Sequence, residues 1–270
     1  MNVEEKKFIS TVWKYYKRHG RHSLPWRKTK NPYRILVSEI MLQQTQVDRV
    51  IPKYREFLKR FPTIRSLADA SLGDVLRAWQ GLGYNRRAKL LHECTRTIMK
   101  TYHGVVPKTY EELVLLSGIG PYTASAIMAF ANGEAVPTIE TNIRTVYLFH
   151  FFKNKRNVSD TTIIRLIERT LDHKNPREWY YALMDYGAYV KKVFGNENVR
   201  SKHYAKHSVF KGSGREVRGA VIRTLNSHPV SARTLSKSLP FSREHIDTQI
   251  AKLLAEGLVV KKGRMYVLPD

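Results

Sequence analysis

Residues 116–124, Leu-Ser-Gly-Ile-Gly-Pro-Tyr-Thr-Ala, constrain the fold more than any other segment of this sequence. Gly118 and Gly120 allow the backbone to turn sharply with positive φ. Pro121 suits the first turn of a helix, where its missing N–H is not needed. The pattern predicts a tight turn into a helix, with free backbone N–H groups that bind one phosphate. Glu140 follows at the predicted start of a later helix, and an acid close behind a phosphate-binding turn indicates chemistry on a nucleic acid.

The charge of the chain agrees with a polyanionic partner. Its 270 residues include 47 Lys and Arg against 23 Asp and Glu, a formal net charge of +24. Such an excess raises the local concentration of polyanions and favours binding through counterion release. No apolar run approaches the length that spans a bilayer, and residues 1–7 lack a signal-peptide pattern. We expect a monomer without membrane contact, located in the cytoplasm and, in a prokaryote, on the nucleoid.

Cysteine usage argues against a bound metal. The chain has one cysteine, Cys94. Neither an internal disulfide nor a cysteine-ligated zinc or iron–sulfur site can be built from a single thiol. We therefore interpret Cys94 as a small buried apolar residue and expect no metal site.

Helical periodicity dominates the first part of the chain, and the rest changes character. Apolar residues recur at helical spacing through 1–195, which predicts a large all-α domain. The stretch 196–214 is basic and contains Gly, Ser and Asn, which is typical of a linker or a surface arm. Residues 215–270 predict three helices followed by a β-hairpin around the turn at 261–264. This order indicates a small C-terminal winged-helix-like (α+β) module.

Five motifs, taken together, resemble those of one family. They are Leu24–Trp26, Ser38–Val47, Gly81–Tyr84, Gly118–Ala124 and Met184–Ala188. The Glu-x-Met-Leu-Gln-Gln-Thr string at 39–45 is the most discriminating part. Together they are similar to the motifs of the helix-hairpin-helix (HhH-GPD) DNA glycosylase superfamily and, within it, of the adenine DNA glycosylases (MutY-like). The resemblance implies a two-lobed domain, with a six-helix lobe at 29–134 and a second lobe formed by 1–28 and 135–195.

The resemblance implies cleavage of the N-glycosidic bond of a DNA base through an oxocarbenium-like sugar. Two carboxyl groups in different environments divide such work in sugar hydrolases. By resemblance, Glu39 is the general acid that protonates the purine, in an apolar pocket that raises its pKa. Glu140 stands where the family usually has aspartate and would stabilise the positive sugar, with Asn142 orienting its carboxylate. The other interpretations are a solvated helix-face charge for Glu39 and an acid that only complements the helix dipole for Glu140.

Tyr122 stands where bifunctional relatives carry a Schiff-base lysine. A tyrosine forms no imine with the sugar, so the resemblance implies a monofunctional glycosylase without AP-lyase activity. Tyr122 would instead hydrogen-bond the Glu140 carboxylate, which places it among the catalytic residues; a packing aromatic at the hairpin is the other interpretation.

The target base must leave the duplex to reach such a pocket, and side chains then fill the gap. By resemblance, Gln43, Gln44 and Tyr84 wedge into the base stack or touch the opposite base, and Thr45 contacts the opposing lesion. Core burial is the other interpretation of Tyr84. Further candidate DNA-binding residues are Gly118, Gly120 and Thr123 of the hairpin, Arg200 and Lys202 of the basic stretch, and Arg86, Arg87 and Lys89, for which a solvated helix face is the other interpretation.

The sequence departs from the family in two further places. Most relatives carry a four-cysteine iron–sulfur cluster after the Met184–Ala188 motif, but no cysteine follows that motif in this chain. We expect no such cofactor, and an alkali-metal ion at the hairpin is left open. Adenine glycosylases typically end in a Nudix-like domain that recognises 8-oxoguanine, and the C-terminal module is too short for one.

The expected function is base excision repair of double-stranded DNA, by hydrolysis that releases adenine mispaired with 8-oxoguanine or guanine. The first alternative is a thymine or uracil glycosylase acting opposite guanine, because pyrimidines leave as stabilised anions and depend less on an acid such as Glu39. The second is a non-catalytic lesion-binding protein, in which glutamate at position 140 marks lost chemistry.

Overall fold

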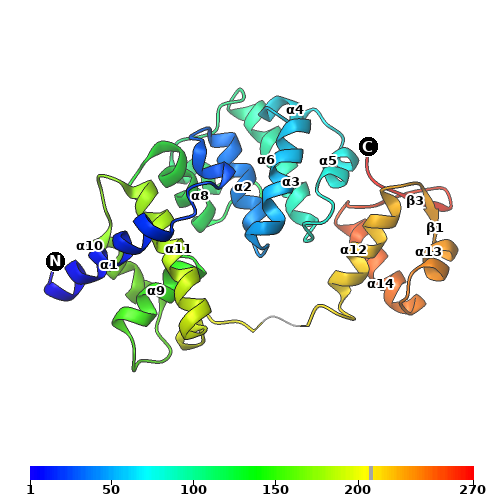
Figure 1. The fold of residues 1–270 in the computed structure, drawn as a ribbon. Helices are drawn as coiled ribbons and strands as arrows, with labels where there is room; N and C mark the ends of the chain where they lie inside the picture. Colours follow the sequence, from blue (N-terminus) through cyan, green and yellow to red (C-terminus); the bar gives the residue numbers. More distant parts are fainter. Residues whose placement is uncertain (207–208) are drawn as a thin grey trace. The chain divides into compact units, whose positions relative to one another are not determined.

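A computed structural model describes residues 1–206 and 209–270 (Figure 1). Helices dominate, as expected, and the strands of the described part form one small sheet. None of the helices described has the length and hydropathy needed to cross a membrane. Residues 207 and 208, within the expected linker, lie outside the described residues. The chain divides into two compact units: the first comprises 1–35, 108–114 and 119–206, and the second comprises 36–107, 115–118 and the described part of 207–270.

Helix α11 (Pro176–Phe194) is central to the first unit and packs against α9 (Thr141–Phe151) and α1 (Val3–His19). Aromatic side chains fill this contact, and the ring centroids of Phe8 and Trp179 lie 6.1 Å apart. Large buried rings stabilise such helix contacts through their apolar area, so this pair fixes α1 against α11. The unit also contains η1 (Pro25–Lys28), α7 (Tyr110–Val114), α8 (Pro121–Ile127), the π-helical turn η2 (Met128–Asn132), α10 (Asp160–Thr170) and η3 (Glu197–Arg200).

A buried ionic cluster joins the loop after α1 to α11. The Asp185 carboxylate, which is 3% exposed, accepts hydrogen bonds from both terminal guanidinium nitrogens of Arg27, at 2.7 and 2.8 Å, and from the backbone N–H of Arg21 at 2.8 Å. Burial raises the pKa of Asp185, but hydrogen bonds and positive charge from Arg27 and Arg21 outweigh burial and hold the pKa below its usual value. The ionised carboxylate therefore fixes the loop that carries the Leu24–Trp26 motif.

Helix α6 (Arg86–Thr101) is the long helix of the second unit and packs against α4 (Ile64–Ala68) and α5 (Leu72–Ala78). The fully buried Trp79 lies at the end of α5, with its ring centroid 5.9 Å from that of Phe57. These contacts form the core that supports the loops preceding α3 and α6. The remaining helices of this part are α3 (Val47–Arg60) and α2 (Pro32–Leu42), which begins in the first unit.

The C-terminal module has the element order of a winged helix, as expected. Strand β1 adds to the predicted hairpin, and the sheet has the antiparallel order β1-β3-β2, with Val230 opposite Tyr266 and Val260 opposite Val267. The module consists of α12 (Gly214–Leu225), β1 (Val230–Ser231), α13 (Ala232–Ser238), α14 (Arg243–Ala255), β2 (Val260–Lys262) and β3 (Met265–Val267).

Two hydrogen bonds to backbone carbonyl oxygens of this module join it to the helices of the second unit. The ammonium group of Lys89 in α6 donates to the carbonyl oxygen of Glu256, at the end of α14, at 2.5 Å. The N–H of Gly73 in α5 donates to the carbonyl oxygen of Pro269 at 2.7 Å. A Cβ at Gly73 would lie 2.5 Å from that oxygen, so glycine permits this approach. Lys89 therefore serves the docking of the module rather than a solvated helix face.

Candidate active site

Glu140 is the residue at which helix α9 begins. Its Oε1 accepts hydrogen bonds from the backbone N–H groups of Asn142 and Ile143, both at 2.8 Å, and its Oε2 accepts one from the Asn142 side chain at 3.2 Å. Glu140 is thus the N-cap of α9, and its carboxylate lies at the positive end of the helix dipole. Asn142 makes the contact that a role in orienting this carboxylate requires.

The surroundings of Glu140 disfavour its negative charge. Burial raises the pKa of the carboxyl group, against the opposing effect of the backbone N–H groups, Arg144 and Asn142. Arg144 is also engaged elsewhere, because its guanidinium donates to the Asp160 carboxylate at 2.7 and 2.6 Å. A carboxylate whose charge is incompletely compensated attracts positive charge, so this arrangement suits the stabilisation of a developing cation.

Helix α11 passes so close to α9 that glycine is required at position 187. A Cβ at Gly187 would lie 2.2 Å from the carbonyl oxygen and 2.7 Å from the carbonyl carbon of Asn142. Gly187 of the Met184–Ala188 motif therefore lies against the backbone of Asn142, the residue that binds the Glu140 carboxylate. Asp185 of the same motif belongs to the buried ionic cluster.

Glu39 lies on α2, in the second unit. Its residue is 7% exposed, and its helix neighbours Leu36, Ile40 and Met41 are 1% exposed or less. This burial excludes a solvated helix-face charge and provides the apolar setting expected for the acid. Glu140 belongs to the first unit, and the convergence of the two carboxyl groups on one nucleotide stays a prediction.

The glycine hairpin forms, but its two glycines differ. Gly118 has φ +78°, and a Cβ there would lie 2.8 Å from the Cβ of Leu90, so both conformation and space require glycine. Gly120 has φ −90° and ψ 177°, so the expected positive φ is wrong at this position. Gly120 is instead the N-cap of α8, and Pro121 is the first helical residue, as predicted. A Cβ at Gly120 would meet no described atom within 4 Å, which leaves room beside the turn.

The first turn of α8 carries the next two candidates. Tyr122 is partly buried. Its contact with Glu140 stays a prediction. Thr123 is 3% exposed, so its side chain packs inside the turn. A contact between its backbone N–H and a phosphate stays a prediction.

Two loops of the second unit carry the residues predicted to enter the base stack. Gln44 follows α2 with φ +55°, and Tyr84 follows Gly83 with φ +48°. Residues other than glycine rarely adopt this conformation, and such strained positions cluster at functional sites. Gln44 is exposed and Tyr84 is 40% exposed, which excludes core burial of Tyr84. Gln43 and Thr45 are partly buried beside Gln44.

One buried arginine joins these two loops. Arg87 is 8% exposed, and its guanidinium donates to acceptors at the end of α2, in the loop of Gln44 and in the loop of Tyr84. Burial lowers the pKa of Arg87 to about 10, so the group stays charged at neutral pH. The acceptors are the carbonyl oxygens of Ile40 (2.7 Å), Met41 (3.0 Å), Gln43 (2.6 Å), Leu82 (3.4 Å) and Gly83 (3.2 Å) and the Thr45 hydroxyl (2.9 Å).

This network corrects one expectation. Arg87 grips no phosphate, because its guanidinium is committed inside the protein. It holds both exposed loops, a role that the sequence pattern did not reveal. Arg86, its neighbour, is exposed and remains available to DNA.

Glu39, the two exposed loops, the hairpin and Glu140 fall within a stretch that has relatives of known function. Residues 37–185, from just before Glu39 to Asp185, match the family model of the HhH-GPD superfamily base excision DNA repair proteins. The chain belongs to the HhH-GPD superfamily. Its relatives include both purine and pyrimidine glycosylases.

Among the relatives of this HhH-GPD protein are adenine DNA glycosylases. That of Mycolicibacterium smegmatis is 34% identical over 260 residues, which cover 89% of each chain. That of Buchnera aphidicola subsp. Baizongia pistaciae is 37% identical over 187 residues, 68% of this chain, and the match spans about half of the relative, 52%. A thymine/uracil-DNA glycosylase of Pyrobaculum aerophilum is 31% identical over 194 residues, 70% of this chain and 84% of the relative.

Solved structures show the same fold. A thermostable thymine-DNA glycosylase has a TM-score of 0.63 and 27% identity, over 68% of this chain and 86% of that chain. An endonuclease III trapped as a covalent DNA intermediate has a TM-score of 0.59 and 17% identity, over 70% of this chain and 88% of that chain. The first likeness extends to sequence, whereas the second concerns the fold alone.

The residues after α11 include no cysteine, so they do not fit the four-cysteine cluster considered in the sequence analysis. Cys94 lies in α6, is 1% exposed, and burial raises the pKa of its thiol to about 12. Arg200 holds the segment after α11 in place instead. Its guanidinium donates to the carbonyl oxygen of Leu148 at 2.8 Å, to the carbonyl oxygen of Phe152 and to the Glu197 carboxylate. These bonds occupy Arg200, which leaves it poorly placed for the expected DNA contact, whereas Lys202 is exposed.

Arg215 contacts the Tyr84 loop, and the sequence analysis missed it. From the first turn of α12, its Nη1 donates to the Tyr84 hydroxyl at 2.8 Å. Its guanidinium carbon lies 5.9 Å from the centroid of the Tyr84 ring and 6.0 Å from that of Phe210. The C-terminal module thus adds a cation to this loop, through a contact between residues 131 positions apart that no local pattern marks.

Proposed function

We propose that the protein is a monofunctional DNA glycosylase of base excision repair that releases adenine mispaired with 8-oxoguanine or guanine. The observation that carries this proposal is the partly buried Glu140 carboxylate, held by Asn142 in a site that favours nearby positive charge. The similarity to an adenine DNA glycosylase over 89% of the chain supports adenine as the released base.

In the proposed reaction, Glu39 donates a proton to a ring nitrogen of adenine as the bond between that base and C1′ of the sugar breaks. Adenine leaves as a neutral molecule, and the sugar becomes an oxocarbenium ion. The Glu140 carboxylate stabilises this cation until a water molecule adds to C1′. The proton lost by the water returns to Glu39, which restores the acid and leaves an abasic site.

The proposed DNA contacts come from the hairpin and the two exposed loops. Residues 118–123 would hold a backbone phosphate of the extruded nucleotide. Gln43, Gln44 and Tyr84 would fill the space that the extruded base leaves, and Thr45 would contact the base opposite. The Arg87 network supports this proposal because it fixes both loops before DNA binds.

We further propose that the enzyme leaves the DNA strand uncut. Tyr122 occupies the place of the lysine that bifunctional relatives use, and a phenol forms no imine with the sugar. Borohydride treatment during turnover should therefore trap no covalent complex between the protein and DNA.

A pyrimidine glycosylase acting opposite guanine is the second candidate. It is favoured by the thymine/uracil-DNA glycosylase that is 31% identical over 84% of its own length, and by the likeness to the thermostable thymine-DNA glycosylase. The two candidates differ in their need for an acid, because thymine and uracil leave as stabilised anions. Glu39→Gln should abolish adenine release, whereas pyrimidine release would survive it.

The deciding experiment is a panel of end-labelled duplexes containing A:8-oxoG, A:G, T:G or U:G, measured under single-turnover conditions with and without alkali. We expect abasic sites from the adenine mispairs only, with strand breaks only after alkali. Glu140→Gln should abolish release but keep or improve DNA affinity, because it removes a negative charge near phosphate. Glu111→Gln, which changes an exposed acid of α7, is the matched control. Tight binding without release of any base would support a lesion-binding protein instead.

A further inference from the structure

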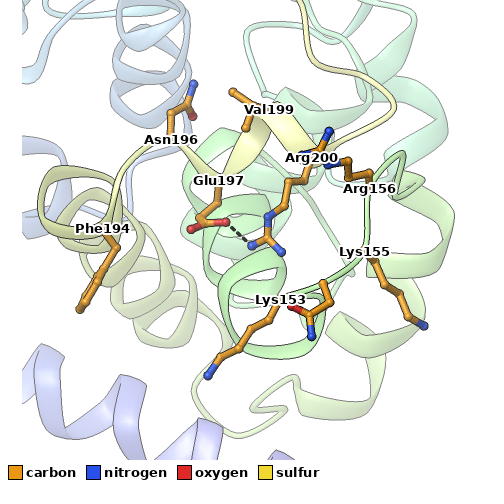
Figure 2. Close-up of a pocket in the computed structure, with 9 residues that line it drawn as sticks. Lys153, Lys155, Arg156, Phe194, Asn196, Glu197, Val199 and Arg200 are labelled. Carbon is orange, nitrogen blue, oxygen red and sulfur yellow. Dashed lines mark hydrogen bonds and ion pairs between the residues drawn. The ribbon is translucent and has the colours of Figure 1, made fainter.

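The loop between α9 and α10 and the segment after α11 enclose a basic pocket in the first unit (Figure 2). The cavity measures about 720 Å³. Its rim combines cationic side chains with two asparagines and an exposed phenylalanine. The lining residues used below are Lys153, Asn154, Lys155, Arg156, Asn196, Glu197 and Arg200.

The base of this pocket is fastened by buried side chains. Besides the Arg200 bonds described above, the Asn198 amide donates to the Thr141 carbonyl oxygen at 3.1 Å and to the Thr145 hydroxyl at 2.6 Å. Asn198 is 4% exposed. Backbone bonds add to this: the N–H of Val158 donates to the carbonyl oxygen of Arg200 at 3.0 Å. The backbone at the base of the pocket is therefore fastened to α9.

The charge of the rim is uncompensated. Lys153, Lys155 and Arg156 are exposed, and within the described ranges no ion pair joins any of them to an acid. The one lining carboxylate, Glu197, is paired with Arg200, as the dashed line in Figure 2 marks. Several cations with amide donors between them match the oxygens of phosphate groups.

The helix that carries this pocket also carries Glu140 at its other end. Helix α9 has 11 residues, so its length is roughly 16 Å at 1.5 Å per residue. Phosphates of one DNA strand are spaced about 3.4 Å apart along the helix axis. The distance between the two ends of α9 therefore corresponds to about five base pairs.

We propose that this basic pocket binds backbone phosphates of the same DNA duplex, about five base pairs from the extruded nucleotide. The proposal rests on the proposed function for its choice of DNA as ligand. Lys153, Lys155 and Arg156 supply the charge, and the amides of Asn154 and Asn196 supply further donors. The pocket strengthens binding without reading the sequence, because phosphate contacts carry no base information.

The test compares duplex length and salt dependence. The variant carries Lys153→Gln, Lys155→Gln and Arg156→Gln, and a matched control carries Lys6→Gln, Lys7→Gln and Lys14→Gln on exposed positions of α1 in the same unit. Dissociation constants are measured between about 50 and 200 mM salt, for a lesion duplex with roughly fifteen base pairs on each side and for one with roughly three.

On the long duplex, the slope of log K against log salt should fall by about 2 to 3 in the pocket variant, since each lost phosphate contact contributes about 0.9. On the short duplex, the variant and the wild type should give equal slopes, and the control should match the wild type on both. Equal slopes on the long duplex, or the same loss on both duplexes, would overturn the proposal.

The two proposals fail in different ways. Single-turnover excision at saturating enzyme should be unchanged in the pocket variant, because the pocket is remote from the reacting atoms. Excision by the wild type together with an unaffected slope would reject the pocket alone. A length-dependent slope in a protein that releases no base would reject the proposed function and keep the pocket.

Discussion

Replacing Arg87 with methionine should both destabilise the protein and slow base release. Methionine keeps the apolar stem but removes every donor of the guanidinium. The carbonyl oxygens of Ile40 and Met41 belong to residues that are 1% exposed or less, so water cannot replace the lost donor there. A buried acceptor left unsatisfied costs about 1–3 kcal/mol, which gives a loss of about 2–6 kcal/mol for the two. In the variant, the acceptors in the exposed loops can form hydrogen bonds with water instead, so they add little to the loss of stability.

The expected loss is large enough to measure by thermal unfolding. At about 2–4 °C per kcal/mol for a chain of this size, the melting temperature should fall by roughly 4 to 24 °C. At temperatures below the new melting temperature, the excision rate should fall by about 10²-fold. Without Arg87 the two loops can shift by about an ångström, and such a shift misplaces the duplex in the site. Arg87→Lys should have a melting temperature and an excision rate between those of the wild type and Arg87→Met. Its ammonium group lacks the fixed fork of donors by which the guanidinium bonds to both loops.

Arg86→Met is the control, because Arg86 is the exposed neighbour in the same helical turn. It should melt like the wild type. Wild-type melting and wild-type excision in Arg87→Met would refute the reasoning, since the hydrogen-bond network would then hold neither loop. A lower melting temperature with an unchanged excision rate would keep the structural role and reject the link to catalysis.

Three further predictions concern other groups. Glu140→Asp keeps a helix-capping acid but shortens its reach, so the melting temperature should stay close to the wild type while single-turnover excision falls at least about tenfold; an equal rate would show that the extra methylene does not set the distance. Asp185→Asn leaves the buried charge of Arg27 unpaired and should lower the free energy of unfolding by about 3–5 kcal/mol in urea titrations; an unshifted midpoint would contradict this. Burial and the charge of Lys153 lower the pKa of His150 to about 4, so below about pH 6.5 the unfolded chain binds the proton more readily and stability should fall as the pH drops toward 4; His150→Phe should flatten this slope in pH-dependent melting, and an unchanged slope would assign it to other groups.

Much of the fold could be predicted from periodicity and from glycine and proline. Helical periodicity through 1–195 predicted an all-α domain, and α9 (Thr141–Phe151) and α11 (Pro176–Phe194) lie within it. The order of three helices and a hairpin indicated the C-terminal module, because helical and strand patterns are local signals. Strand β1, only two residues long, is too short to leave such a signal.

The side-chain networks could not be predicted in the same way. Arg86 and Arg87 are adjacent and of the same type, so the sequence does not show which of them is buried. Only the folded loops show that their carbonyl oxygens face Arg87. Arg215 and Tyr84 are far apart in the chain, so their contact has no local pattern. The hairpin contains two glycines, and sequence alone did not distinguish the one with positive φ, Gly118, from the extended Gly120.

The contact between Gly187 and Asn142 links two backbones rather than two side chains. Rotamer changes cannot loosen it, so the reach of the Glu140 carboxylate depends on how far apart two helix axes lie. A mutational library that varies substrate-contacting positions while leaving Gly187 untouched would preserve this alignment. Any added side chain at 187 would instead push α9 away from α11 and so displace the Glu140 carboxylate without touching it.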